Sequence, residues 1–260
     1  MKAVLLFLFY LFLHLPAFAQ TPGIIYKPAV GTGAKVLDPN GDGYVSVSRS
    51  GFSGTNDEGT GFSEISYRPF PALTTEPLGD LNTGSSGGHT DLATPTPGDA
   101  FTGSPVAAYF DGTNLLFRIR LGGSSTASKG YSVLIDSDGK FDGTGTNPGF
   151  EYEVLLASNF AVQVIQHTPT GTNAIFTGSI DQYSQRAVAA STSGGNPDYF
   201  YDFYVPLSAF NGGITAATPL RMSGITITSA QSGITGTVSD VGGVDFQAYH
   251  DDAPAAWRAL

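Results

Sequence analysis

The chain contains no cysteine, so no disulfide bond stabilises it, and its stability must come from the size of its core, from bound metal, or from both. Basic residues are also few: 12 lysines and arginines stand against 22 aspartates and glutamates, for a net charge of −10. Nucleic acid is therefore not expected as a partner, because phosphate binding needs a basic surface. Divalent cations suit this acidic chain better.

Long helical patterns of leucine, alanine, glutamate and lysine are missing, whereas glycine (34) and proline (16) are abundant. This composition favours many short strands joined by turns. The chain also lacks the H-E-x-x-H and P-loop motifs. His167 has no candidate catalytic or ligand partner near it in sequence. The sequence therefore predicts a protein that is not an enzyme.

The longest apolar run lies at the N-terminus and is too short to span a membrane. It follows Lys2, covers residues 3–15, and leads to Ala-Phe-Ala at residues 17–19. These features are typical of a secretory signal, so residues 1–19 are predicted to be removed and the mature chain to begin at Gln20. We expect a secreted or cell-surface protein without a transmembrane segment in the mature chain.

Three segments between residues 115 and 156 alternate apolar and polar side chains with the period of a β-strand. One face of each segment is apolar: Leu115, Phe117, Ile119 and Leu121; Tyr131, Val133 and Ile135; Phe150, Tyr152, Val154 and Leu156. The opposite faces carry Arg118, Arg120, Asp136, Glu151 and Glu153. We expect these strands to share one sheet that is covered by a core on one side only, as in an antiparallel sandwich.

The remaining patterns extend this to an all-β fold, an antiparallel β-sandwich of jelly-roll or immunoglobulin-like type with about nine strands. Further strands are predicted at residues 106–111, 160–166, 174–180, 186–190, 199–205 and 220–228, with one helical turn at 206–210. The predicted organisation is a signal at 1–19, an irregular segment at 20–100, the sandwich at 101–230, and a tail or the start of a truncated region at 231–260.

The irregular segment contains a loop with the spacing of an EF-hand calcium site. Oxygen donors at loop positions 1, 3, 5, 7 and 9 would come from Asp38, Asn40, Asp42, the backbone carbonyl of Tyr44, and Ser46. Gly43 at position 6 permits the turn. Position 12 is Arg49, so Asp57, Glu58 or Glu64 would have to complete the shell. The alternative is an Asx-rich turn that binds no metal.

A second cation candidate is the acidic loop of Asp136, Asp138 and Asp142. Its spacing is not that of an EF-hand, and Asp138-Gly139 alone would suit a hairpin turn, so both interpretations stay open. His89 and Asp91 lie in the Pro/Gly/Thr/Ser-rich segment at 66–101, which we expect to be a solvated loop.

Glu151 and Glu153 have the spacing of a possible catalytic carboxylate pair, about 7 Å apart along a strand. Arg118 and Arg120 have the same spacing on a strand that is expected in the same sheet. An exposed cross-strand ladder of ion pairs therefore explains all four residues better than catalysis does.

The strand at 199–205 is aromatic on both faces. Tyr199 and Tyr201 share one face with Phe203, and they could form a flat platform on which sugar rings stack. The alternative is that both faces of this strand are covered.

Four motifs resemble a known module as a set: DGTNLLFRIRLGG at 111–123, GYSVLIDSDG at 130–139, NPGFEYEV at 147–154 and YDFYVPLSAF at 201–210. They resemble the N-terminal region of large surface proteins of gliding-type bacteria, exported by type IX secretion. That region is similar in turn to DOMON-like and family-nine carbohydrate-binding sandwiches, and the resemblance covers residues 106–228. The loop at 38–46 is similar to a single dockerin-type calcium loop.

This resemblance implies a cell-surface or adhesion module with calcium as cofactor and an extracellular glycan or surface protein as partner. The alternatives are a carbohydrate-binding module and an enzyme that acts on extracellular polysaccharide.

Overall fold

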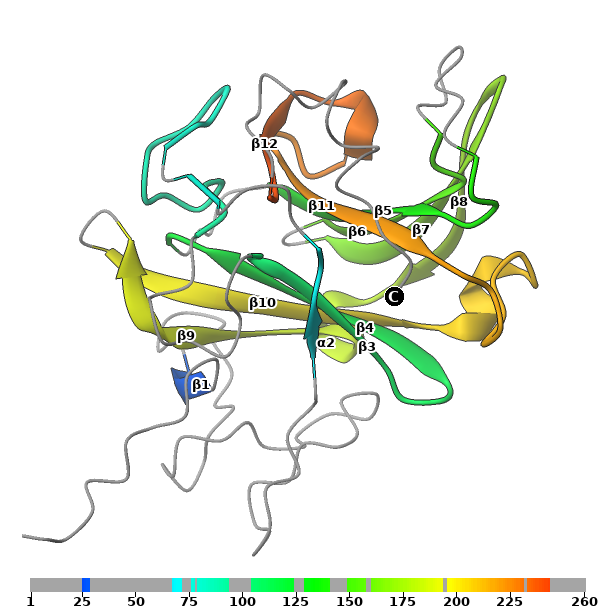
Figure 1. The fold of residues 1–260 in the computed structure, drawn as a ribbon, viewed down its shortest axis with the longest axis horizontal. Helices are drawn as coiled ribbons and strands as arrows, with labels where there is room; N and C mark the ends of the chain where they lie inside the picture. Colours follow the sequence, from blue (N-terminus) through cyan, green and yellow to red (C-terminus); the bar gives the residue numbers. More distant parts are fainter. Residues whose placement is uncertain are drawn as a thin grey trace, which may run out of the picture.

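The computed structural model describes residues 25–28, 67–71, 76–77, 79–93, 104–123, 129–140, 149–157, 160–193, 196–231 and 233–243. Over these residues the chain forms two six-stranded antiparallel sheets, which pack face to face as two layers (Figure 1). The all-β sandwich that the alternating pattern predicts is thus confirmed. Within this described part, no helix is long and apolar enough to cross a membrane.

The first sheet has the order β1-β9-β10-β4-β3-β2. Its strands are β1 (Ile25–Pro28), β2 (Arg68–Pro69), β3 (Val106–Phe110), β4 (Asn114–Leu121), β9 (Ser184–Ser193) and β10 (Asn196–Pro206). The second sheet has the order β12-β11-β5-β6-β7-β8. Its strands are β5 (Gly130–Asp136), β6 (Tyr152–Ala157), β7 (Ala161–Thr168), β8 (Gly171–Gly178), β11 (Arg221–Ile227) and β12 (Val238–Val241).

The structure has more strands than the sequence pattern predicts, because its short edge strands show too little alternation to be recognised. Strand β12 lies where the sequence predicted a tail, and it extends the second sheet beyond residue 230. The described residues also form three short helical segments: α2 (Ile180–Tyr183), η1 (Leu207–Phe210) and η2 (Gly233–Thr235). The first of the two 3₁₀ turns confirms the helical turn predicted after β10.

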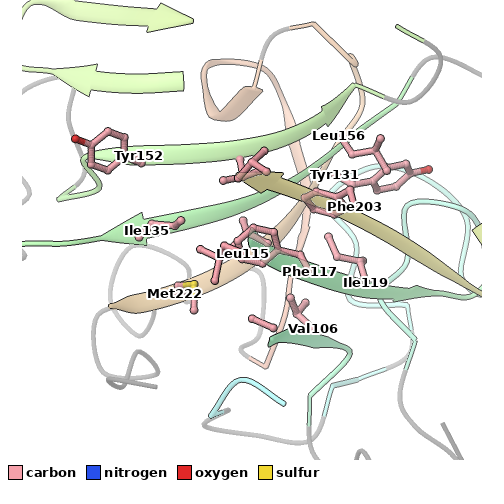
Figure 2. Close-up of a cluster of buried hydrophobic side chains, with 14 of the residues drawn as sticks. Val106, Leu115, Phe117, Ile119, Tyr131, Ile135, Tyr152, Leu156, Phe203 and Met222 are labelled. Atoms are coloured by element: carbon pink, nitrogen blue, oxygen red, sulfur yellow. The ribbon is translucent and has the colours of Figure 1, made fainter. Parts of the chain in front are cut away.

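The main core lies between the two sheets. Figure 2 shows Phe117, Ile119 and Phe203 of the first sheet close to Tyr131 and Leu156 of the second. The predicted apolar faces of β4 and β5 are confirmed. On the third segment, Tyr152, Val154 and Leu156 also join this core. Phe150 does not: it precedes β6 and packs in another buried cluster with Leu134 and Leu155, on the opposite side of the sheet.

The prediction that the three central segments share one sheet is wrong. Strand β4 pairs with β3 and β10 in the first sheet, whereas β5 and β6 pair with each other in the second. The predicted ladder between the arginines of β4 and the glutamates near β6 therefore does not form. Arg118 instead pairs with Asp202 on β10 through two N···O contacts of 2.7 Å, and Arg120 lies 3.4 Å from Asp198.

The prediction of one covered face is also wrong, because both sheets carry buried clusters on their outer sides. On the first sheet these residues are Tyr67, Ala107, Leu116 and Tyr204, and on the second they include Leu134, Leu155, Ile225 and Ile227. The guanidinium of Arg118 lies 4.6 Å from the Tyr67 ring centre and 4.3 Å from that of Phe200. Arg118 is only 8% exposed, so its ion pair is buried rather than solvated.

Replacing Arg118 by alanine should therefore cost about 3–5 kcal/mol of unfolding free energy, because the Asp202 carboxylate would remain buried without its partner. Phe117→Ala, which opens a cavity in the core, should cost a similar amount of about 3–5 kcal/mol. Urea unfolding measures both variants. The control is Lys140→Ala, which removes an exposed ion pair and should change little. A cost for Arg118→Ala as small as the control's would contradict the buried pair.

Candidate metal centre

The loop at residues 79–93 connects the two sheets through hydrogen bonds to both. The Gly122 N–H, at the end of β4, donates to the Asp91 carbonyl oxygen at 2.9 Å. From the other sheet, the Thr226 hydroxyl of β11 donates to the Thr90 carbonyl oxygen at 2.6 Å. This short segment, rich in glycine and serine, is therefore a structural link and not a peripheral loop.

Asp91 organises the loop from inside. It is fully buried, and its carboxylate accepts hydrogen bonds from the backbone N–H groups of Gly79, at 3.4 Å, and Gly87. The neighbouring Leu92 is also fully buried and forms a β-bridge with Leu121 of β4. The prediction of a solvated loop around His89 and Asp91 is thus wrong for Asp91, because its side chain supplies the acceptors that the buried backbone needs.

Three further carboxylates meet beside this loop. Glu76, Asp80 and Asp240 each place an oxygen within 4.8 Å of an oxygen of the other two. Glu76 and Asp240 are buried. Backbone N–H groups hold both in place: Gly243 donates to Glu76 at 2.5 Å, and Leu92 donates to Asp240 at 2.7 Å. The cluster thereby joins the loop to β12.

Burial and like charge both disfavour ionisation in this cluster. Burial, together with the neighbouring carboxylates of Asp240, Asp80 and Asp91, raises the pKa of Glu76 to about 10. Burial, together with Asp80 and Asp91, raises the pKa of Asp240 to about 8. Protons or a cation would relieve the repulsion among these carboxylates. Their oxygens are the ligand type that hard cations such as calcium prefer.

The sequence alone did not reveal this centre, because its members are distant along the chain. The hydrogen bond from Gly243 to Glu76, for example, spans 167 positions. Asp80 and Asp91 stand in a segment rich in glycine, serine and threonine, where the sequence shows no fixed ligand spacing. Only the pairing of β12 with β11 brings Asp240 to this loop.

The second acidic loop also gathers carboxylates: Asp136, Asp138 and Glu151 place oxygens within 4.8 Å of one another. Here the protein supplies its own donors. The Arg221 guanidinium lies 2.8 Å from Asp136, and the Ser137 N–H donates to Glu151 at 2.7 Å. A cation would have to compete with these contacts. The third predicted ligand, Asp142, lies outside the described residues.

The residues of the predicted EF-hand-like loop, Asp38, Asn40, Asp42, Tyr44, Ser46 and Glu64, lie outside the described residues, so that site stays a prediction. The predicted aromatic platform is wrong. Tyr201 is 5% exposed and packs against Tyr131, with ring centres 4.9 Å apart, and Tyr199 is half-buried against the same core. This face of β10 is turned toward the opposing sheet, and so it is closed to a sugar.

Comparisons with known proteins give little further information. No protein-family model and no curated protein matches the chain. Among solved structures, the chain is similar to a "putative carbohydrate-binding protein" from Bacteroides uniformis, with 10% identity and a TM-score of 0.33. The match covers 75% of this chain and 85% of that one. A likeness at this TM-score carries no argument about function.

The raised pKa values of Glu76 and Asp240 predict how the stability of the metal-free protein depends on pH. The ordinary pKa values are 4.5 for Glu76 and 3.8 for Asp240, and the values in the folded protein are about 10 and about 8. At pH values between these limits, the folded state binds more protons than the unfolded state. Stability should therefore fall as the pH rises from 5 to 8, by about 1.4 kcal/mol per pH unit for each extra proton bound.

Urea unfolding of metal-free protein at several pH values measures this slope. The Asp240→Asn variant has one fewer titrating carboxyl and should show a smaller slope. Equal slopes in the two proteins would contradict the raised pKa of Asp240.

Proposed function

We propose that this protein is a non-catalytic β-sandwich module of the bacterial cell surface whose fold is stabilised by calcium bound at Glu76, Asp80 and Asp240. The observation that carries the proposal is the meeting of these carboxylates, two of them buried, between the loop at 79–93 and β12. A divalent cation replaces their mutual repulsion by attraction, and it compensates for the loss of hydration on burial.

Calcium fits this centre better than other common metals do. The three grouped ligands are all carboxylates, without the histidine or cysteine that zinc sites usually contain. Calcium accepts six to eight oxygens in flexible geometry, so carboxylates, backbone carbonyls and water together can complete its shell. Magnesium demands a stricter octahedron and gives up its water reluctantly.

The surface role rests on the predicted export signal and on the resemblance to secreted adhesion modules. A protein without disulfide bonds gains most from a metal that joins distant segments, and this cluster joins the loop to the last strand. Extracellular calcium sites bind at about 10⁻⁴–10⁻³ M, which suits a module that acts outside the cell.

The absence of catalysis is part of the proposal. Glu153 is fully buried, and its oxygens already accept hydrogen bonds from Ser132 and from the Ile234 N–H. Glu151 is engaged with Ser137. Glu153 lines a cavity whose lining does not include Glu151, so the two carboxylates do not face one substrate together as those of glycosidases do.

Calcium should raise the stability of the protein by about 2.7 kcal/mol at a concentration a hundredfold above Kd, if it binds only the folded state. Thermal unfolding with calcium chloride and with chelator tests this. The shift should disappear in Asp240→Asn and in Glu76→Gln. It should persist in Asp138→Asn, the matched control in the other acidic cluster.

The Asp42→Ala variant separates the two possible calcium sites. If the calcium-dependent shift is lost in Asp42→Ala and retained in Asp240→Asn, calcium binds the EF-hand-like loop and the centre proposed here is wrong. A melting temperature that does not respond to calcium in the wild-type protein would end the metal proposal altogether.

A further inference from the structure

A second candidate site, a polar cavity, lies on the outer face of the second sheet. It shares no residue with the Glu76–Asp80–Asp240 cluster. A cavity of about 210 Å³ is bounded there by β6, β7, β8 and the segment around η2. Most of its lining side chains are polar: Glu153, His167, Gln163, Gln231, Thr172 and Thr235.

A buried hydrogen-bond network belongs to this cavity. The His167 Nε2 atom lies 3.2 Å from Glu153 Oε2, and both side chains are almost fully buried. The other carboxylate oxygen accepts from Ser132, and the Ile234 N–H lies 3.1 Å from it.

The segment at η2 is shaped to approach this carboxylate. Gly233 has a φ of +54°, and a Cβ at this position would lie 2.7 Å from Glu153 Oε2. Only glycine fits both the backbone conformation and the available space. The backbone at η2, which forms one wall of the cavity, is therefore held close to Glu153.

The network does not have the geometry of a hydrolytic triad. In a triad the imidazole lies between the hydroxyl and the carboxylate. Here the carboxylate of Glu153 lies between Ser132 and His167, so the histidine cannot take a proton from the serine. The arrangement instead presents a fixed imidazole to a polar cavity, which favours binding over chemistry.

We propose that this cavity binds a small neutral molecule with several hydroxyl groups, the size of a single sugar unit. Each amide and hydroxyl of the wall can both donate and accept, as the neighbouring hydroxyls of such a ligand do. The Gln163 amide nitrogen is directed to Thr177 at 3.3 Å, which leaves its carbonyl oxygen as an acceptor. No lysine or arginine is among the described lining residues, so the site does not select an anion.

A cationic ligand is disfavoured because Glu153 already accepts from His167, Ser132 and Ile234. An apolar ligand would remove water from the lining amides and hydroxyls without replacing their hydrogen bonds. A hydroxyl-rich ligand satisfies both constraints. This proposal does not depend on calcium binding elsewhere in the protein.

The test is a titration of the calcium-saturated protein with glucose, galactose, mannose, N-acetylglucosamine and ethanolamine, followed by NMR. At least one sugar should produce saturable shifts of the Gln163 and Gln231 side-chain amides and of the His167 ring. Gln163→Ala and Gln231→Ala should each weaken this binding by about two- to tenfold, the contribution of one neutral hydrogen bond. Both positions lie on the cavity wall, so the melting temperature should be unchanged.

Arg68→Ala is the control, because Arg68 lines a different and mostly apolar cavity of about 290 Å³. It should leave sugar binding unchanged. The proposal is overturned if no sugar shifts the cavity residues, if the shifts are lost in Arg68→Ala but kept in both glutamine variants, or if only the cationic ethanolamine binds.

Discussion

The burial of carboxylates between the 79–93 loop and β12 is the constraint on which the rest of the fold depends. Asp91 arranges the loop by accepting from its backbone, and the loop then bonds to both sheets. Asp240 holds the same loop from β12 through the Leu92 N–H. Burial and the neighbouring carboxylates raise the pKa values of Glu76 and Asp240, so protons at low pH, or the cation proposed above, would relieve the repulsion within the cluster. A cation there would act on the same loop that is hydrogen-bonded to both sheets.

Other buried charges lie directly beside a basic side chain. Arg118 and Asp202 face each other directly across β4 and β10, with aromatic rings against the guanidinium. Asp136 has Arg221, and Glu153 lies 3.2 Å from the His167 Nε2 atom. These pairs are expected because the outer faces of the sheets are covered. A charged side chain on a covered strand is removed from water, so it needs a partner within the protein. The Glu76–Asp80–Asp240 cluster brings three carboxylates within 4.8 Å of one another, and this grouping makes it the candidate for a cation.

The two proposed sites would have different roles. A cation at the carboxylate centre would stabilise the framework, whereas the cavity beside η2 offers a polar surface built mainly on strands. Strands hold side chains more precisely than loops do, which suits recognition of a small ligand by several hydrogen bonds. The aromatic strand β10, by contrast, contributes its rings to the core, where Phe117 and Phe203 lie with ring centres 5.5 Å apart.

The sequence by itself determined the longer strands, the sandwich class and most core faces, because alternation with a period of two is a local property that burial selects directly. The sequence could not show to which sheet β4 belongs, because the alternating pattern of β4 suits either sheet. It could not orient Tyr201 either, because β10 is aromatic on both faces and only pairing with β4 turns one of them to the core. The partners of Arg118, Asp240 and Glu153 lie far away in the chain, at Asp202, Leu92 and His167 among others. Only the tertiary structure decides such contacts, because they are set by strand order and not by spacing along the chain.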